Sequence, residues 1–212
     1  MNQEARWSAR YGAVGDEYLF GTVPNLYLTR HASLFSAGGR ALSVADGEGR
    51  NAVWLAEQGL AVTAVEISPV ALRKAHRLAA ARSVEVDFRQ EDMLAAGWPA
   101  AELRGAFDFV VAIFIQFVGP ELRARQFEAL RAATRPGGRI VLQGYTPRQL
   151  EYGTGGPAQL ENLYTAAMLQ EAFADWEIEE LAEYEDDVAE GSGHCGRSAL
   201  IGMVARRPQE EA

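Results

Sequence analysis

The sequence is organised around the stretch RALSVADGEGRNAVWLAEQGLAVTAVEIS, which covers residues 40–68. It begins with a short apolar run, Ala41–Ala45, which is typical of a buried β-strand. The next four residues, Asp46–Gly49, include two glycines, which let the backbone turn tightly and approach a ligand closely. A helical pattern then ends at Gly59, and a second apolar run, Leu60–Val65, predicts another strand. The stretch therefore predicts a strand, a glycine turn, a helix and a second strand.

An acidic residue, Glu66, stands at the tip of the second predicted strand. A carboxylate at this place can accept hydrogen bonds from both hydroxyls of a ribose. A Gly-x-Gly turn alone is ambiguous, because many α/β domains use one only to pack a strand against a helix. The strand on each side and the acid that follows favour a bound adenosine-type cofactor over a purely structural turn.

The composition sets limits on the class of protein. The chain has 212 residues, of which 48% are hydrophobic, and this is enough for one domain with a full core, residues 1–212. A net charge of -9 argues against a nucleic-acid partner, because phosphate backbones are bound by clustered Lys and Arg. The single cysteine, Cys195, excludes an intramolecular disulfide, and three histidines without ligand spacing predict no metal site.

The chain also lacks the sequence signals of membrane proteins and secreted proteins. No run approaches the roughly 18 apolar residues of a membrane span. The polar start, Met1–Arg10, has no apolar core like that of a signal peptide. We therefore expect a cytoplasmic protein that acts on a small molecule, as a monomer or homodimer, without a membrane partner.

Helices and strands are predicted to alternate along most of the chain. An alternating run, residues 84–89, is typical of an edge strand, and the almost uninterrupted apolar run 107–115 is typical of a central one. No helix separates the last two predicted strands, which implies an antiparallel pair in a mostly parallel sheet. The other helices are predicted over 24–35, 69–82, 121–134 and about 159–174, and the other strands over 140–142, 176–187 and 198–205. The acidic run 177–190 is interpreted as a solvated edge strand.

This order of elements, with a Gly-x-Gly turn after the first strand and an acid after the second, resembles the class I S-adenosylmethionine (SAM) methyltransferases. The resemblance implies a Rossmann-like α/β sandwich: a seven-stranded, mostly parallel sheet with an antiparallel last strand and helices on both faces. It also implies SAM as cofactor and S-adenosylhomocysteine (SAH) as product. Within 1–212, the parts are then a cofactor-covering segment 1–38, a SAM-binding core 39–145, a substrate-side loop and helix 146–175, and a C-terminal strand pair 176–206.

The closer resemblance is to the branch that contains tellurite-resistance methyltransferases and, more distantly, thiopurine methyltransferase. It rests on residues 47–51 and 62–66, on Trp7, Arg10-Tyr11 and Gly21-x-x-Pro24-Asn25 near the N-terminus, and on the turn Pro136-Gly137-Gly138. Two positions depart from the family pattern. Ser43 stands where most members carry an acid that helps to place the methionine part of SAM, and Ala45 replaces the first glycine. The resemblance then leaves Asp46, or water, to hold the ammonium group.

Carried over position by position, the resemblance implies a set of cofactor-binding residues. Glu66 is expected to bind the ribose hydroxyls and Ile67 to face the adenine. Alternatives stay open for some members, since Glu91 and Asp92 can simply cap the next turn and Phe114 can belong to the core. The full set is Trp7, Tyr18, Ala45, Asp46, Gly47, Glu48, Gly49, Asn51, Glu66, Ile67, Glu91, Asp92, Met93, Ala112 and Phe114.

Three residues are candidates for catalysis. Methyl transfer is an in-line displacement, which depends mainly on alignment and exclusion of water, so a base is optional. His194 is the best candidate for a base, and the alternative is a solvated hairpin loop. Arg148, which can orient an anionic substrate or be an ordinary exposed arginine, and Tyr152 follow the fifth predicted strand, where loops build the pocket of an open α/β sheet.

The function predicted from the sequence is SAM-dependent methyl transfer to a small acceptor, with a thiol, selenium or tellurium nucleophile favoured by analogy. One alternative is an NAD-linked oxidoreductase, because Gly47-x-Gly49-x-x-Ala52 and Glu66 also fit a dinucleotide fingerprint. The other is a SAM-binding protein without catalysis, which the missing acid at Ser43 keeps open.

Overall fold

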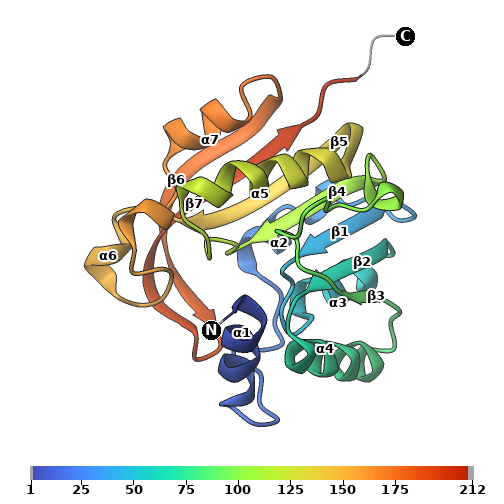
Figure 1. Ribbon diagram of the computed structural model, residues 1–212, viewed down its shortest axis with the longest axis vertical. Helices are drawn as coiled ribbons and strands as arrows, with labels where there is room; N and C mark the ends of the chain where they lie inside the picture. The colour runs from blue at the N-terminus through green and yellow to red at the C-terminus, as the bar shows by residue number, and fades with distance from the viewer. Residues whose placement is uncertain (1, 210–212) are drawn as a thin grey trace.

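The computed structural model describes residues 2–209, which form a seven-stranded sheet covered by helices on both faces (Figure 1). The strand order is β3-β2-β1-β4-β5-β7-β6. β1 to β5 pair in parallel, whereas β7 runs antiparallel to both of its neighbours. The predicted fold class is confirmed. The strands are β1 Arg40–Val44, β2 Ala61–Glu66, β3 Asp87–Gln90, β4 Phe107–Ile113, β5 Thr134–Tyr145, β6 Glu177–Glu190 and β7 His194–Arg206.

The helices enclose two apolar cores, one on each face of the sheet. One core joins the sheet to α5 and α7, and the other joins it to α2 and α3, with α4 packed beside α3. Side chains on successive positions of a strand point to opposite faces, so β4 in the centre supplies both cores. The helices are α1 Gln3–Gly12, α2 Leu26–Arg30, α3 Arg50–Glu57, α4 Pro69–Arg82, α5 Pro120–Ala133, α6 Gln149–Tyr152 and α7 Ala166–Ala172, with short 3-10 turns at Ala32–Leu34, Ala101–Leu103 and Leu160–Asn162.

Several predicted elements agree with the structure. α4 has the predicted bounds because the Ser68 hydroxyl accepts a hydrogen bond from Ala71 N, 3.2 Å away, and Pro69 occupies the first helical position. β3 lies at one edge of the sheet, β6 lies at the other, and β4 is central, as their sequence patterns predict.

Three predicted elements differ most from the structure. The helix expected over 24–35 is interrupted after Arg30, where His31 caps the short α2 and a 3-10 turn follows. The expected turn Pro136-Gly137-Gly138 belongs to β5, whose pairing with β4 is irregular there. A Cβ at Gly138 would lie 2.9 Å from the Phe107 carbonyl oxygen. The region expected to be helical over 159–174 contains only the 3-10 turn and α7.

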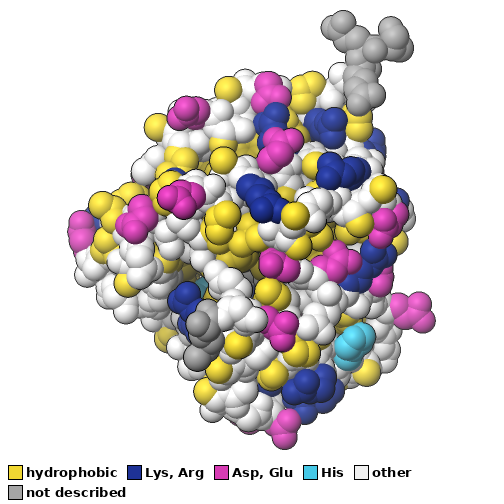
Figure 2. Space-filling view, in the orientation of Figure 1, with side chains coloured by type: hydrophobic (Ala, Val, Ile, Leu, Met, Phe, Trp, Pro, Cys, Tyr) yellow, Lys and Arg dark blue, Asp and Glu magenta, His cyan; other side chains and the backbone are white. Residues whose placement is uncertain are grey.

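The N-terminal segment lies against the end of the sheet where β1 and β2 finish. α1 packs beside α4, and Gly193 N donates to the Leu19 carbonyl oxygen at 3.2 Å, so the segment also contacts the β6–β7 hairpin (Figure 1). Within residues 2–209, no helix has the length and apolar character needed to cross a membrane. On the face drawn in Figure 2, basic and acidic side chains of the described residues are interspersed.

Candidate active site

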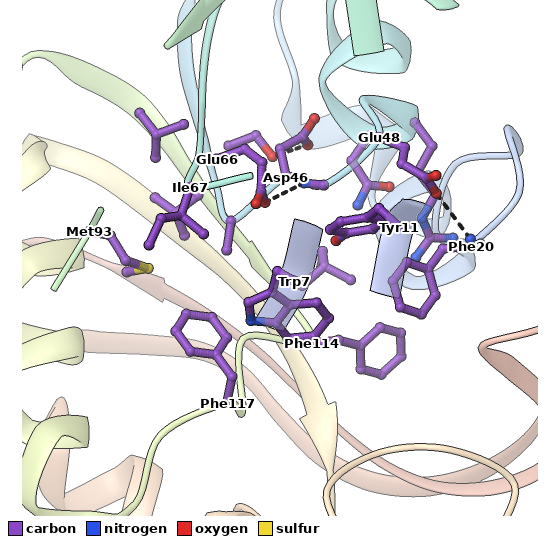
Figure 3. A pocket seen from close by; sticks show the side chains of 18 of the residues that line it. Trp7, Tyr11, Phe20, Asp46, Glu48, Glu66, Ile67, Met93, Phe114 and Phe117 are labelled. Carbon is purple, nitrogen blue, oxygen red and sulfur yellow. Dashed lines mark hydrogen bonds between the residues drawn. The ribbon is translucent and has the colours of Figure 1, made fainter. Parts of the chain in front are cut away.

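A pocket lies at the carboxyl ends of β1, β2 and β4, and α1 forms one of its walls. Figure 3 shows carboxylates of Asp46, Glu48 and Glu66 along one side and aromatic rings, among them Trp7 and Phe117, along the other. The lining residues are Gln3, Trp7, Tyr11, Phe20, Gly21, Ser43, Val44, Ala45, Asp46, Gly47, Glu48, Arg50, Asn51, Val65, Glu66, Ile67, Glu91, Asp92, Met93, Leu94, Ile113, Phe114, Phe117 and His194.

Two positions of the turn require glycine, because of their backbone conformation and because of close neighbouring atoms. Gly47 and Gly49 have φ of 67° and 93°, which favour glycine. A Cβ at Gly47 would lie 2.7 Å from the Tyr11 Oη, and a Cβ at Gly49 would lie 2.8 Å from the Ala75 Cβ. The turn therefore brings backbone close to both α1 and α4. Gly49 itself does not line the pocket.

The Asp46 carboxylate lies in the pocket wall, and only one of its two oxygens forms hydrogen bonds with the described residues. Its Oδ1 accepts hydrogen bonds from Ser43 Oγ at 2.5 Å and from Ala52 N at 3.2 Å. Its Oδ2 is buried and has no hydrogen-bond partner among the described residues. Burial raises the pKa of Asp46 to about 6. A buried carboxylate oxygen without a partner is costly to the free protein and suits a cationic ligand.

The Glu66 carboxylate is also buried, at 4% exposure, and faces the same space. It accepts hydrogen bonds from Ser68 N at 2.7 Å and from Gly47 N at 3.0 Å, so it links the tip of β2 to the glycine turn. Burial is the main cause that raises its pKa to about 7, and the nearby Asp46 adds to this. Two acids with raised pKa values in one pocket are typical of a functional site.

Glu48 lines the pocket but is already neutralised. Its carboxylate pairs with the buried Lys74 ammonium at 2.9 Å, and it accepts from Phe20 N at 3.3 Å. Lys74 also donates to the carbonyl oxygens of Tyr11 and Glu17, at 2.8 Å and 2.6 Å. Glu48 and Lys74 therefore fasten the N-terminal segment over the pocket.

Several other predicted cofactor residues line the pocket and have a second contact. Glu91 accepts a hydrogen bond from Trp98 Nε1 at 2.7 Å. Asp92 accepts one from Leu94 N at 2.8 Å, so Asp92 both lines the pocket and caps the turn that follows it. Asn51 accepts from Asn25 N at 2.9 Å. The predicted residues among the lining are Trp7, Ala45, Asp46, Gly47, Glu48, Asn51, Glu66, Ile67, Glu91, Asp92, Met93 and Phe114.

Other predicted residues lie outside the pocket. Tyr18 donates to the Lys74 carbonyl oxygen at 3.1 Å, and Ala112 is fully buried in the core between the sheet and α5. Arg148 is a surface residue that pairs with Glu185, and its guanidinium lies 6.0 Å from the Tyr152 ring. Neither Arg148 nor Tyr152 is among the residues that line the pocket, because α6 packs against β7 beyond it.

His194 forms part of the pocket wall instead of a solvated hairpin loop. It begins β7, and its ring lies 4.5 Å from the Phe114 ring and 4.6 Å from the Phe20 ring. Burial lowers its pKa to about 3, and the charges of Arg50 and Arg10 act in the same direction. Its Nδ1 is buried without a partner among the described residues. His194 is therefore neutral near pH 7.

Sequence reasoning missed several lining residues. Gln3, Trp7 and Tyr11 are four residues apart and share one face of α1, so helical spacing was the available signal. Only Trp7 was predicted to bind the cofactor. Phe20 and Phe117 come from irregular segments, whose positions depend on tertiary contacts. The missed residues are Gln3, Tyr11, Phe20, Gly21, Ser43, Val44, Arg50, Val65, Leu94, Ile113 and Phe117.

Comparison with known proteins agrees with this geometry. Residues 41–138 match the family model described as a methyltransferase domain. One solved structure, from a study of the conversion of a disulfide bond into a thioacetal group during echinomycin biosynthesis, aligns with a TM-score of 0.80 and 20% identity, over 100% of this chain and 95% of that one. Residues 41–138 are thus similar to a methyltransferase domain, and the whole chain shares the fold of that solved structure.

The finer resemblance extends to the fold of the tellurite-resistance branch. TehB from Haemophilus influenzae aligns with a TM-score of 0.69 and 19% identity, over 96% of this chain and 66% of that one. Uncharacterized proteins of Mycobacterium tuberculosis and Mycobacterium bovis are 32% identical over 65% of this chain. The chain spans about half, 47%, of the length of these curated relatives.

One neighbour in fold was solved with the product of a SAM-dependent reaction. Magnesium protoporphyrin IX methyltransferase (ChlM) from Synechocystis PCC 6803, solved with bound SAH, aligns with a TM-score of 0.63 and 16% identity, over 85% of this chain and 78% of that one. The residues here fit such a ligand, because the unpartnered Asp46 oxygen suits an ammonium group and the buried Glu66 suits ribose hydroxyls.

Proposed function

We propose that the protein is a SAM-dependent methyltransferase that acts on a small molecule with a soft nucleophilic atom. The observation that carries this proposal is the pair of buried acids in one pocket, Asp46 with its unpartnered oxygen and Glu66 beside the glycine turn. We further expect a cytoplasmic monomer or homodimer without a nucleic-acid partner.

The chain's own residues divide the task of holding the cofactor. Asp46 Oδ2 is proposed to hold the ammonium group, and it takes over the role of the acid missing at Ser43, whose hydroxyl orients Asp46. Glu66 is proposed to accept from the ribose hydroxyls, and Ile67 and Met93 to pack against the adenine. When bound, SAM supplies an electrophilic methyl group.

The rest of the pocket excludes water and aligns the acceptor. Trp7, Phe20, Phe114 and Phe117 supply aromatic walls, and such surroundings favour an in-line displacement by removing competing solvent. His194 has a pKa of about 3, so it is a weak base near neutral pH. An acceptor that needs no strong base, such as a thiol or a selenium or tellurium nucleophile, suits this site best.

Transfer of the methyl group from isotopically labelled SAM tests the proposal. The purified protein is incubated with labelled SAM and with thiol, selenium, tellurium, amine and hydroxyl acceptors, and both SAH and methylated product are quantified. We expect SAH and methylated product in equal amounts with at least one soft nucleophile. Binding of SAM without turnover by any acceptor class would favour the alternative of a SAM-binding protein without catalysis.

A matched set of variants connects the result to the pocket. Asp46→Asn and Glu66→Ala are expected to lower the affinity for SAM, whereas Glu85→Ala, an exposed acid before β3, is expected to leave it unchanged. Tight binding of NADH in place of SAM would support the oxidoreductase alternative and contradict the proposed role of Asp46.

A further inference from the structure

Arg10 lies across two aromatic rings that line the pocket. Its guanidinium carbon is 5.2 Å from the centre of the Trp7 ring and 5.4 Å from that of Phe20. Both rings belong to the pocket wall, and Figure 3 shows them on the side opposite the carboxylates of Asp46 and Glu66. Arg10 stands three residues after Trp7 on α1, so the helix places its side chain on the same face.

The Arg10 guanidinium has no carboxylate partner among residues 2–209. The arginine that lines the pocket, Arg50, is paired with the buried Glu190 at 2.5 Å, and the buried Lys74 is paired with Glu48. No hydrogen bond or ion pair of the Arg10 side chain is formed within the described residues. Because aromatic faces hold a guanidinium without using its N–H donors, these donors stay available to a ligand.

The positive charge of Arg10 acts on the part of the pocket where His194 lies. It contributes, after burial and Arg50, to the lowered pKa of His194, and it also acts on Tyr145 behind that wall. The opposing acid near Tyr145 is Glu190, which is itself paired with Arg50. At His194, the charges of Arg10 and Arg50 therefore both disfavour a positive charge on the ring.

Given the proposed function, on which this inference rests, we propose that Arg10 binds the methyl acceptor as a thiolate and favours that form over the thiol. The thiol proton leaves to solvent before transfer. The thiolate lone pair then forms the new S–C bond with the methyl carbon, and the electron pair of the breaking C–S bond stays on the departing sulfur. This arrangement accounts for a site whose histidine is a poor base.

The charge of Arg10 also discriminates between acceptor classes. A protonated amine would be repelled by the guanidinium and would need a base to react. A thiol gains from the same charge, because each unit by which its pKa falls increases the thiolate fraction about tenfold while the thiol form dominates. The geometry thus favours a soft anion over an amine.

The test uses SAH-loaded protein with two aromatic probes of similar shape. Thiophenol can ionise and its thiolate has its own ultraviolet band, whereas thioanisole, the methylated form, cannot ionise. The pKa of bound thiophenol is measured from this band, and the affinities of both probes are measured by calorimetry. The variants are Arg10→Gln, Arg10→Lys and, as the matched control, Arg6→Gln, an exposed arginine on the same helix.

We expect the pKa of bound thiophenol to be lower in the wild type than in Arg10→Gln by about one unit, which is a tenfold change in ionisation. Arg10→Lys should restore most of this shift, and Arg6→Gln should match the wild type. Thioanisole affinity should change little in every variant. An unchanged thiophenol pKa in Arg10→Gln, or failure of the wild type to bind thiophenolate more tightly than thioanisole, would overturn the proposal.

SAH affinity separates this inference from the proposed function. If the wild type and Arg10→Gln bind SAH equally, the variant is folded and its cofactor site is intact, so a lost pKa shift is due to Arg10. If the wild type does not bind SAH, the proposed function fails, and the role of Arg10 falls with it.

Discussion

At the scale of single residues, the site depends on two acids that burial keeps partly protonated. The pKa of Asp46 is raised from 3.8 to about 6 and that of Glu66 from 4.5 to about 7, so each folded carboxyl binds a proton more tightly than its unfolded counterpart. The stability of the ligand-free protein therefore falls as the pH rises from the unfolded pKa values, 3.8 and 4.5, through the folded values, about 6 and about 7. Under the proposed function, the cofactor binds the ionised forms and compensates for this cost.

The first prediction concerns Asp46→Asn in the absence of ligand. Asparagine resembles the protonated acid, so the variant should be more stable than the wild type at pH 7.5, by about 1–3 kcal/mol. At pH 4 the difference should be small, because Asp46 in the wild type is then protonated as well. Urea denaturation at both pH values measures the free energy of unfolding, and a destabilised variant at pH 7.5 would contradict the prediction.

The second prediction concerns the pH dependence of SAH binding. The ammonium group is expected to prefer ionised Asp46, so affinity should fall as the pH decreases from 7.5 to 5, and binding near pH 6 should release protons. Calorimetry in two buffers with different ionisation enthalpies counts these protons. In Asp46→Asn the proton release should decrease. An equal release in both proteins would show that the protons come from a group other than Asp46.

At the scale of elements, α1 is held over the pocket by one buried lysine of α4. Lys74 is 3% exposed and donates to two carbonyl oxygens of the N-terminal segment as well as to Glu48. Removing one partner of a buried ion pair leaves the other charge uncompensated. The attachment of α1 therefore depends strongly on this side chain.

The third prediction follows for Lys74→Met. It should destabilise the protein by about 3–5 kcal/mol and weaken SAH binding, because Glu48 is left buried and unpaired. Lys74→Met with Glu48→Gln should recover part of the stability. The control is Arg77→Gln, on the same helix as Lys74, which removes an exposed ion pair with Asp16. It should have little effect when all variants are compared by thermal and chemical denaturation.

The sequence predicted those elements whose signals are local. The strand, glycine turn and acid around Gly47 and Glu66 lie within one short stretch, so their order predicted the fold and the cofactor. The position of His194 was not predictable in this way, since its burial depends on Phe20 and Phe114 from distant segments. Arg148 and Tyr152 lie outside the pocket lining, because α6 packs against β7 and Arg148 pairs with Glu185, and neither contact has a local sequence signal.

At the scale of the whole molecule, the topology brings the end of every parallel strand to one edge of the sheet, where the pocket lies. The switch in strand order between β1 and β4 opens this edge, and the N-terminal segment covers it. The antiparallel β6–β7 hairpin then brings His194 to the same place. In the proposed function, the two acids of this pocket bind the cofactor, and its aromatic rings, with Arg10 beside them, bind the acceptor.

The most direct test of this account is calorimetric titration of the purified protein with SAM, SAH and NADH. We expect micromolar or tighter binding of SAM and SAH, loss of affinity in Glu66→Ala and no heat from NADH. Binding of NADH alone, or SAH affinity that is unchanged in Glu66→Ala, would contradict the assignment of this pocket to SAM.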